Sequence, residues 1–186
     1  NREFRGFTGL IGSGSISTGE KIRVLPSGTE STVARIVTYD GDLELAGAGR
    51  SVTLTLTDEI DISRGDIIAS ADSPCSSADQ FQARILWMDD DAMMPGREYL
   101  FKSNSQTSSM TLGRLKHRID VNTLEELPAK VLDMNEIGVC NISLSSRIAF
   151  DPYDEDPVMG GFVIVDRMTN NTVGMGLIDF ALRRAD

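Results

Sequence analysis

The sequence feature that most constrains the fold is an alternation of apolar and polar residues with a period of two. In Ser51–Thr57, three aliphatic side chains alternate with hydroxyl side chains. Successive side chains of a strand point to opposite faces, so this pattern predicts a strand with one buried face. The pattern recurs in residues 140–145. In residues 173–177 it predicts an apolar face and a bare face at Gly174 and Gly176, where a backbone or a bulky side chain can approach closely.

Helical patterns are scarce, and the strand-like segments are short and separated by glycine turns. Thr123–Ala129 has room for a short helical turn before Pro128 interferes. We therefore predict an all-β protein of two antiparallel β-barrels in tandem. The small, polar segment Ser70–Asp79 marks the boundary between them. The first barrel is predicted over residues 1–72, a linker over 73–78 and the second barrel over 79–186.

A glycine-rich segment, residues 6–24, opens the chain. A phosphate-binding loop needs a helix after it, but this segment leads into another strand-like pattern, and the chain contains no Gly-x-x-x-x-Gly-Lys-Ser/Thr motif. We interpret the segment as a β-hairpin in which glycines form the turns, with Leu10, Ile16, Ile22 and Val24 inside.

Composition and charge exclude several classes of protein. The net charge of −10 over 186 residues argues against sequence-independent nucleic-acid binding, which depends on Lys and Arg contacts to phosphates. No apolar run approaches the roughly 20 residues of a membrane-spanning helix, and the first residues lack a signal-peptide core. We expect a cytoplasmic protein without a membrane partner. Cys75 and Cys140 lie in unlike settings, so both are predicted to be reduced structural thiols.

His117 is the sole histidine, so any general-base or metal chemistry would pass through it. It lies in Arg114–Leu124, where Leu115, His117, Ile119 and Val121 alternate with polar residues. This pattern predicts that His117 shares the apolar face and is a core or rim residue with one hydrogen bond. A free-standing β-barrel enzyme that uses His117 remains an alternative hypothesis.

The opposite face of the same strand carries Arg114, Lys116 and Arg118. Such a row is usually solvated, but a basic stripe on an acidic chain can steer an acidic partner. These three residues are our candidate contact with a partner or a neighbouring domain.

Acidic clusters occur at three places in the chain, Asp58–Asp61, Asp89–Asp91 and Asp151–Asp156. None has the ligand spacing of a calcium-binding helix-loop-helix motif. We interpret them as solvated loops, and we predict no catalytic, cofactor-binding or metal-binding residue in this chain.

Several phrases of the sequence resemble the second and third domains of translation-factor GTPases such as elongation factor Tu. They are Gly9–Glu20, Ala46–Val52, Ile62–Ile68, Gly160–Arg167 and Thr172–Gly176. The resemblance implies the tandem-barrel architecture. It also leaves open a translation factor that binds aminoacyl-tRNA.

Further phrases resemble, more specifically, the large GTPase subunit of bacterial sulfate adenylyltransferase, including the form fused to adenylylsulfate kinase. They are Arg114–Leu124, Met134–Asn141, Asp58–Asp66, Ile148–Tyr153 and Phe180–Arg184, and the match runs nearly end to end. The segment Asp154–Met159 departs from the family, whose members often carry a more basic stretch there.

This resemblance implies a parent enzyme that makes adenylylsulfate and pyrophosphate from ATP and sulfate, assisted by GTP hydrolysis. A separate small catalytic subunit would carry out adenylyl transfer, and GTP and Mg²⁺ would bind an N-terminal GTPase domain outside this sequence. The implied partners are that subunit, that domain and, in the fused form, a C-terminal kinase domain. We expect this chain alone to be non-catalytic.

Overall fold

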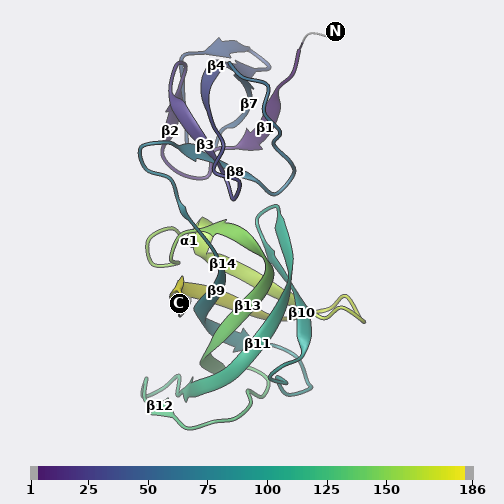
Figure 1. Cartoon of the computed structure of the whole chain (residues 1–186). Helices are drawn as coiled ribbons and strands as arrows, with labels where there is room; N and C mark the ends of the chain where they lie inside the picture. The colour runs from purple at the N-terminus through teal and green to yellow at the C-terminus, as the bar shows by residue number, and fades with distance from the viewer. Residues whose placement is uncertain (1–3, 183–186) are drawn as a thin grey trace. The chain divides into compact units, whose positions relative to one another are not determined.

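The computed structural model describes residues 4–182 and divides the chain into two compact units, Asn1–Cys75 and Ser76–Asp186 (Figure 1). The division falls inside the predicted linker. Strand β9 (Ser76–Trp87) begins three residues before the predicted start of the second barrel, because Ser76–Ala78 pair with Ile148–Phe150. Arg183 and Arg184, which carry part of the family resemblance, lie outside the described residues.

The first unit is an antiparallel β-structure that curls around a small apolar core (Figure 1). Its strands are β1 (Phe7–Leu10), β2 (Ser15–Ser17), β3 (Lys21–Leu25), β4 (Glu30–Thr38), β5 (Gly41–Leu43), β6 (Leu45–Gly47), β7 (Ser51–Leu56) and β8 (Ile67–Ser70). The main sheet has the order β1-β7-β4-β3-β8, β5 pairs with β4, and β2 and β6 form a separate ribbon. The predicted half-buried strand Ser51–Thr57 is β7.

The glycine-rich segment does not form the predicted hairpin. Its strands all pair elsewhere: β1 with β7, β2 with β6, and β3 with β4 and β8. Ile22 and Val24 are buried as predicted, and Ile16 packs against the core. Leu10 is 67% exposed because it lies on β1, an edge strand with a single neighbour. Local glycine spacing indicated the turns correctly but not the long-range strand pairing.

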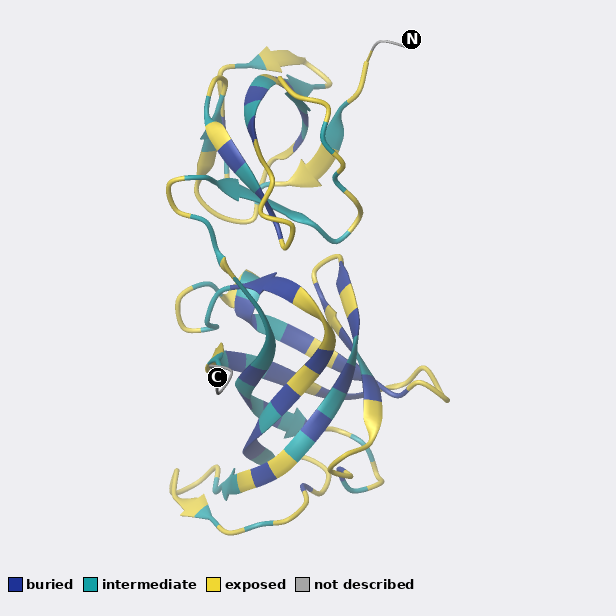
Figure 2. Ribbon diagram, in the orientation of Figure 1, coloured by how far each residue is buried: buried dark blue, intermediate teal, exposed yellow. Residues whose placement is uncertain are grey.

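The second unit is a closed barrel. Its elements are β9, β10 (Glu98–Ser103), β11 (Gln106–Ile119), β12 (Glu126–Leu127), β13 (Ile137–Phe150), α1 (Pro157–Gly160), β14 (Gly161–Val165) and β15 (Thr172–Ala181). The order β10-β14-β15-β9-β13-β11 forms a ring because β10 also pairs with β11, and β12 extends β11 at one end. Alternate residues along these strands are buried (Figure 2). Thr123–Ala129 holds a turn and β12 rather than a helical turn.

Large aromatic side chains fill the barrel interior. Phe81, Trp87, Tyr99 and Phe101 are at most 2% exposed. Phe101 stacks on Phe162 with a centroid distance of 4.7 Å. This packing contributes to the hydrophobic stabilisation of the barrel, since aromatic side chains bury large apolar areas.

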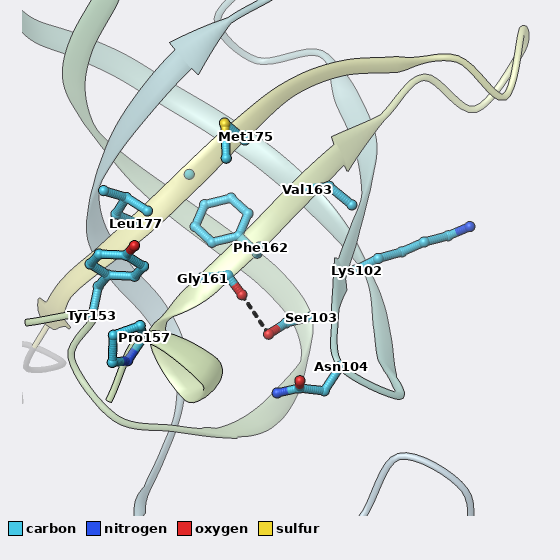
Figure 3. A pocket seen from close by; sticks show the side chains of 11 residues that line it. Lys102, Ser103, Asn104, Tyr153, Pro157, Gly161, Phe162, Val163, Met175 and Leu177 are labelled. Carbon is cyan, nitrogen blue, oxygen red and sulfur yellow. Dashed lines mark hydrogen bonds between the residues drawn. The ribbon is translucent and has the colours of Figure 1, made fainter. Parts of the chain in front are cut away.

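The strand β15 turns its glycines toward these aromatic rings. A Cβ atom added to Gly176 would lie 2.1 Å from Cζ of Phe162, so the predicted close approach is confirmed. The prediction of a buried apolar face is wrong for Met175 and Leu177. These two residues flank Gly176 and point outward (Figure 3). The ring of Phe162 occupies the interior volume that a larger residue at position 176 would need.

We expect the substitution Gly176→Ala to destabilise the protein by about 1–3 kcal/mol, because its methyl group would overlap the Phe162 ring in a packed core. Urea unfolding followed by far-ultraviolet circular dichroism measures the change. Gly9→Ala on β1 is the control, since no atom lies within 4 Å of its added Cβ. Equal stability of the two variants would contradict this account of β15.

Candidate functional site

The predicted partner strand, β11, does not alternate evenly. Its register with β13 shifts on both sides of Leu115, so that Leu115 pairs with Cys140 and His117 pairs with Val139. Cys140 and Val139 are consecutive residues and therefore face opposite sides of the sheet. The bulge thus places Leu115 in the core and His117 on the outer face. The prediction that they share a face is wrong.

Among the residues that the structure describes, one carboxylate lies within 4.0 Å of the His117 imidazole. Its Nε2 atom lies 3.4 Å from Oε1 of Glu126, and its side chain is 22% exposed. Within the part of the chain that the structure describes, no Ser or Cys nucleophile contacts this imidazole. A general base needs a nucleophile within hydrogen-bond reach. The geometry is that of a residue at the rim of the barrel, beside β12.

The bulge also separates the three candidate contact residues. Arg118 forms an ion pair with Glu136. The Nζ atom of Lys116 donates to Oε1 of Gln82 at 2.5 Å, which takes its side chain across β13 to β9. Arg114 is exposed and has no side-chain hydrogen bond or ion pair among residues 4–182. Because Gln82 is neutral, Arg114 and Lys116 both keep an uncompensated positive charge.

A chain of polar contacts continues from Gln82 along the outside of the barrel. Gln82 donates through Nε2 to Asp179 at 3.2 Å, and Arg84 donates through Nε to the same carboxylate at 2.7 Å. Arg84 also donates to Asp154 at 3.1 Å. The contacts link β9 and β15 to the loop before α1, and they give Arg84 two carboxylate partners.

Cys140, the residue opposite Leu115, is chemically protected. Burial raises the pKa of its thiol from 9.0 to about 12, and the nearby Lys116 opposes this shift only in part. The thiolate is the reactive form of cysteine, so Cys140 is inert at neutral pH. Neither Cys140 nor the half-buried Cys75 forms a disulfide bond.

The acidic clusters take part in local structure. Asp156 caps α1 by accepting from the N–H groups of Val158 and Met159, and Asp58 accepts from Ser31. Over residues 4–182, no group of three or more His, Cys, Asp or Glu residues is arranged to hold a metal ion. The same residues include no helix long and apolar enough to cross a membrane.

The glycine-rich segment has no geometry for a nucleotide phosphate. Gly14 and Gly19 have φ angles of 66° and 83° and lie in turns between strands. A phosphate site of this type needs the N-terminus of a helix, and β3 follows instead. The segment therefore lacks the helix N-terminus of such a phosphate site.

A surface groove lies on the outer side of β14 and β15 and was not predicted from the sequence. It is shallow and open to solvent, has a volume of about 390 Å³, and lies between these strands, the β10–β11 turn and the loop before α1 (Figure 3). Its lining residues are Lys102, Ser103, Asn104, Tyr153, Pro157, Gly161, Phe162, Val163, Met175, Gly176 and Leu177. The alternation in residues 173–177 indicated an apolar face of this strand, but we predicted that this face lies in the core.

A second hollow of about 160 Å³ contains Arg97 and Asp166, which form an ion pair with each other. The other oxygen of Asp166 accepts from the N–H groups of Met168 and Thr169. These hydrogen bonds, with Arg97 adding to them, lower the pKa of Asp166. Both carboxylate oxygens of Asp166 are therefore engaged. We interpret the hollow as part of a structural turn.

The closed six-stranded barrel preceded by a second β-unit defines the tandem-barrel class found in translation-factor GTPases. Sup35 in complex with GDP shares the fold with a TM-score of 0.85 at 18% identity, over 96% of this chain and 46% of that chain. Elongation factor SelB from Methanococcus maripaludis gives a TM-score of 0.75 at 20% identity, over 95% of this chain and 40% of that chain. The prediction of two tandem antiparallel barrels is confirmed.

Residues 80–179 match the family described as GTP-eEF1A C-terminal domain-like, and the chain belongs to this family. It is 49% identical over its whole length to the bifunctional enzyme NodQ of Rhizobium meliloti and covers 29% of that protein. It is 47% identical over 96% of its length to sulfate adenylyltransferase subunit 1 of Aeromonas hydrophila and covers 38% of it. The bifunctional enzyme CysN/CysC of Xylella fastidiosa is 48% identical over 95% of the chain, which covers 28% of that enzyme. The chain therefore spans well under half the length of these relatives, and the resemblance to the sulfate adenylyltransferase large subunit is confirmed.

The burial of Cys140 predicts a specific pH dependence of stability. A thiol whose folded-state pKa is raised stabilises the fold fully below its ordinary pKa of 9.0, and this contribution is lost as the pH rises toward about 12. We expect the free energy of unfolding of the wild type to fall relative to Cys140→Ala by up to about 1.4 kcal/mol per pH unit within that window. Urea titrations at several pH values measure it. Cys75→Ala, which keeps Cys140, is the control, and parallel profiles for the wild type and Cys140→Ala would contradict the expectation.

Proposed function

We propose that this chain is the two-barrel region of the large, GTP-hydrolysing subunit of sulfate adenylyltransferase. The observation that carries the proposal is the near 50% identity across both units to proteins named sulfate adenylyltransferase subunit 1 and to bifunctional relatives. Fold likeness alone would not distinguish this family from translation factors.

In this proposal the barrels are a coupling module. GTP and Mg²⁺ bind an N-terminal GTPase domain outside this sequence, and the small subunit joins ATP and sulfate into adenylylsulfate. The barrels transmit the nucleotide state by adopting two interdomain arrangements that GTP and GDP favour unequally. Rigid barrels suit this role, because closely packed cores move as units rather than deform continuously. The protein acts in the cytoplasm, and in the bifunctional form a kinase domain follows.

The proposed contact for the small subunit is the outer side of β11. Arg114 and Lys116 carry the uncompensated positive charge there, whereas Arg118 forms an ion pair with Glu136 within the barrel. An outward pair of positive charges on a chain with a net charge of −10 favours an acidic partner surface.

The rival hypotheses explain less. Binding of aminoacyl-tRNA would place a phosphate backbone against a strongly acidic chain. Catalysis by His117 would rely on an imidazole whose polar neighbour is the exposed Glu126. Neither hypothesis accounts for the identity to sulfate adenylyltransferase relatives.

The proposal is tested with the complete protein and the small subunit of the same organism. We expect adenylylsulfate synthesis that GTP stimulates, and loss of that stimulation when a non-hydrolysable GTP analogue is supplied. The 186-residue chain alone is expected to hydrolyse no GTP. Adenylylsulfate synthesis that does not depend on GTP would contradict the proposal. GTP hydrolysis by the isolated 186-residue chain, if substitutions in that chain abolish it, would contradict it as well.

Charge reversal at Arg114 and Lys116 tests the contact surface. We expect Arg114→Glu/Lys116→Glu in the complete protein to slow association with the small subunit about three- to tenfold at low salt, with a weaker effect at high salt. Surface plasmon resonance measures the rates. Lys21→Glu/Arg64→Glu, a double reversal at exposed residues of the first unit, controls for net charge because it changes the net charge by the same amount. Arg118 is left unchanged because its reversal would break the pair with Glu136. An association rate equal to that of the control would remove this surface from consideration.

A further inference from the structure

The groove on β14 and β15 has walls that are held in place by hydrogen bonds. Ser103 Oγ donates to the carbonyl oxygen of Gly161 at 2.7 Å, and Asn104 Nδ2 donates to that of Val158 at 2.8 Å. On the other side, the N–H group of Tyr153 donates to Ile178 at 2.9 Å. These contacts fix the β10–β11 turn and the loop before α1 around the groove, so it is formed before any ligand binds (Figure 3).

The groove leaves apolar side chains in water. Met175 is 41% exposed and Val163 is 37% exposed, although they pair with each other across β14 and β15. Leu177 and Pro157 extend the same surface. The barrel cannot bury these side chains, because the interior beside them is filled by Phe162. A contiguous apolar surface in a preformed concavity is typical of an interaction site.

Lys102 is the one charged residue among those that line the groove. Its side chain is exposed, and among residues 4–182 no carboxylate pairs with it. Glu98, a carboxylate on the same strand as Lys102, forms its ion pair with Arg167 instead. The groove therefore combines an apolar floor with a single unpaired cation at its edge, although the chain as a whole is strongly acidic.

The strand register sets the spacing of these features. Lys102 pairs with Val163, and Val163 pairs with Met175, so the three residues form one row across β10, β14 and β15. Adjacent strands lie about 4.8 Å apart, which separates the backbones of Lys102 and Met175 by about 10 Å, and the Lys102 side chain extends from there away from Met175 (Figure 3). An extended peptide covers this span in about three residues.

We propose that the groove binds a segment of a partner polypeptide that places an apolar side chain against Met175 and a carboxylate, two or three residues further on, against Lys102. The floor supplies hydrophobic contact, and the lysine sets the direction of the segment and rejects basic sequences. This surface lies on β10, β14 and β15 and is distinct from Arg114 and Lys116 on β11. The proposal rests on the chemistry of the groove and not on the identity of the small subunit.

The test uses the 186-residue chain with ¹³C-labelled methionine methyl groups and two acetylated, amidated tetrapeptides, Phe-Ser-Asp-Asp and Phe-Ser-Lys-Lys. We expect the acidic peptide to shift the Met175 resonance and to bind at least about fivefold more tightly than the basic peptide. Met168, which is 85% exposed and does not line the groove, is expected not to shift. The buried Met93 and Met110 report that the fold is intact.

Lys102→Glu is the decisive variant, because it should reverse the preference between the two peptides while Met93 and Met110 keep their resonances. Lys21→Glu is the matched control and should keep the wild-type preference. The proposal is overturned by equal shifts at Met168 and Met175, by absence of a Met175 shift at 10 mM peptide, or by a preference that Lys102→Glu leaves unchanged.

Discussion

The pairing of β10 with both β11 and β14 is the interaction on which the second unit depends. It closes six strands into a ring, so that no long edge of the barrel exposes unpaired N–H and C=O groups. Closure also fixes the interior volume, which Phe81, Trp87, Tyr99 and Phe101 fill together with Phe162. In the regular stretches of each strand, every other residue is then forced outward, whatever its polarity.

The surface features of the barrel follow from that fixed interior. Because the Phe162 ring lies against Gly176, the large residues on either side of this glycine have no space inside. Met175 and Leu177 consequently line the groove. The same packing that stabilises the core therefore produces an apolar surface.

The sequence was sufficient to predict strands and the all-β class, since both follow from local alternation and turn composition. It was not sufficient to predict which face is inside. Period-two alternation in residues 173–177 is equally compatible with either orientation, and the aromatic partner that decides it lies on β14.

The pairing of β1 with β7 was missed because it joins segments about 40 residues apart. The candidate contact on β11 was only partly predictable, because a bulge at Leu115 changes the face of every later residue and cannot be read from alternation.

The bulge gives the outer side of β11 a different composition from that of a regular strand. Without it, His117 would follow Leu115 into the core, where an imidazole would need a buried partner. On the same outer side, Lys116 reaches Gln82, and the polar contacts continue through Asp179 and Arg84 to Asp154, next to Tyr153 of the groove wall. The two proposed surfaces would then contribute to binding in different ways. Exposed charges on β11 act at long range and mainly raise the association rate, whereas an apolar groove acts only on contact and mainly slows dissociation.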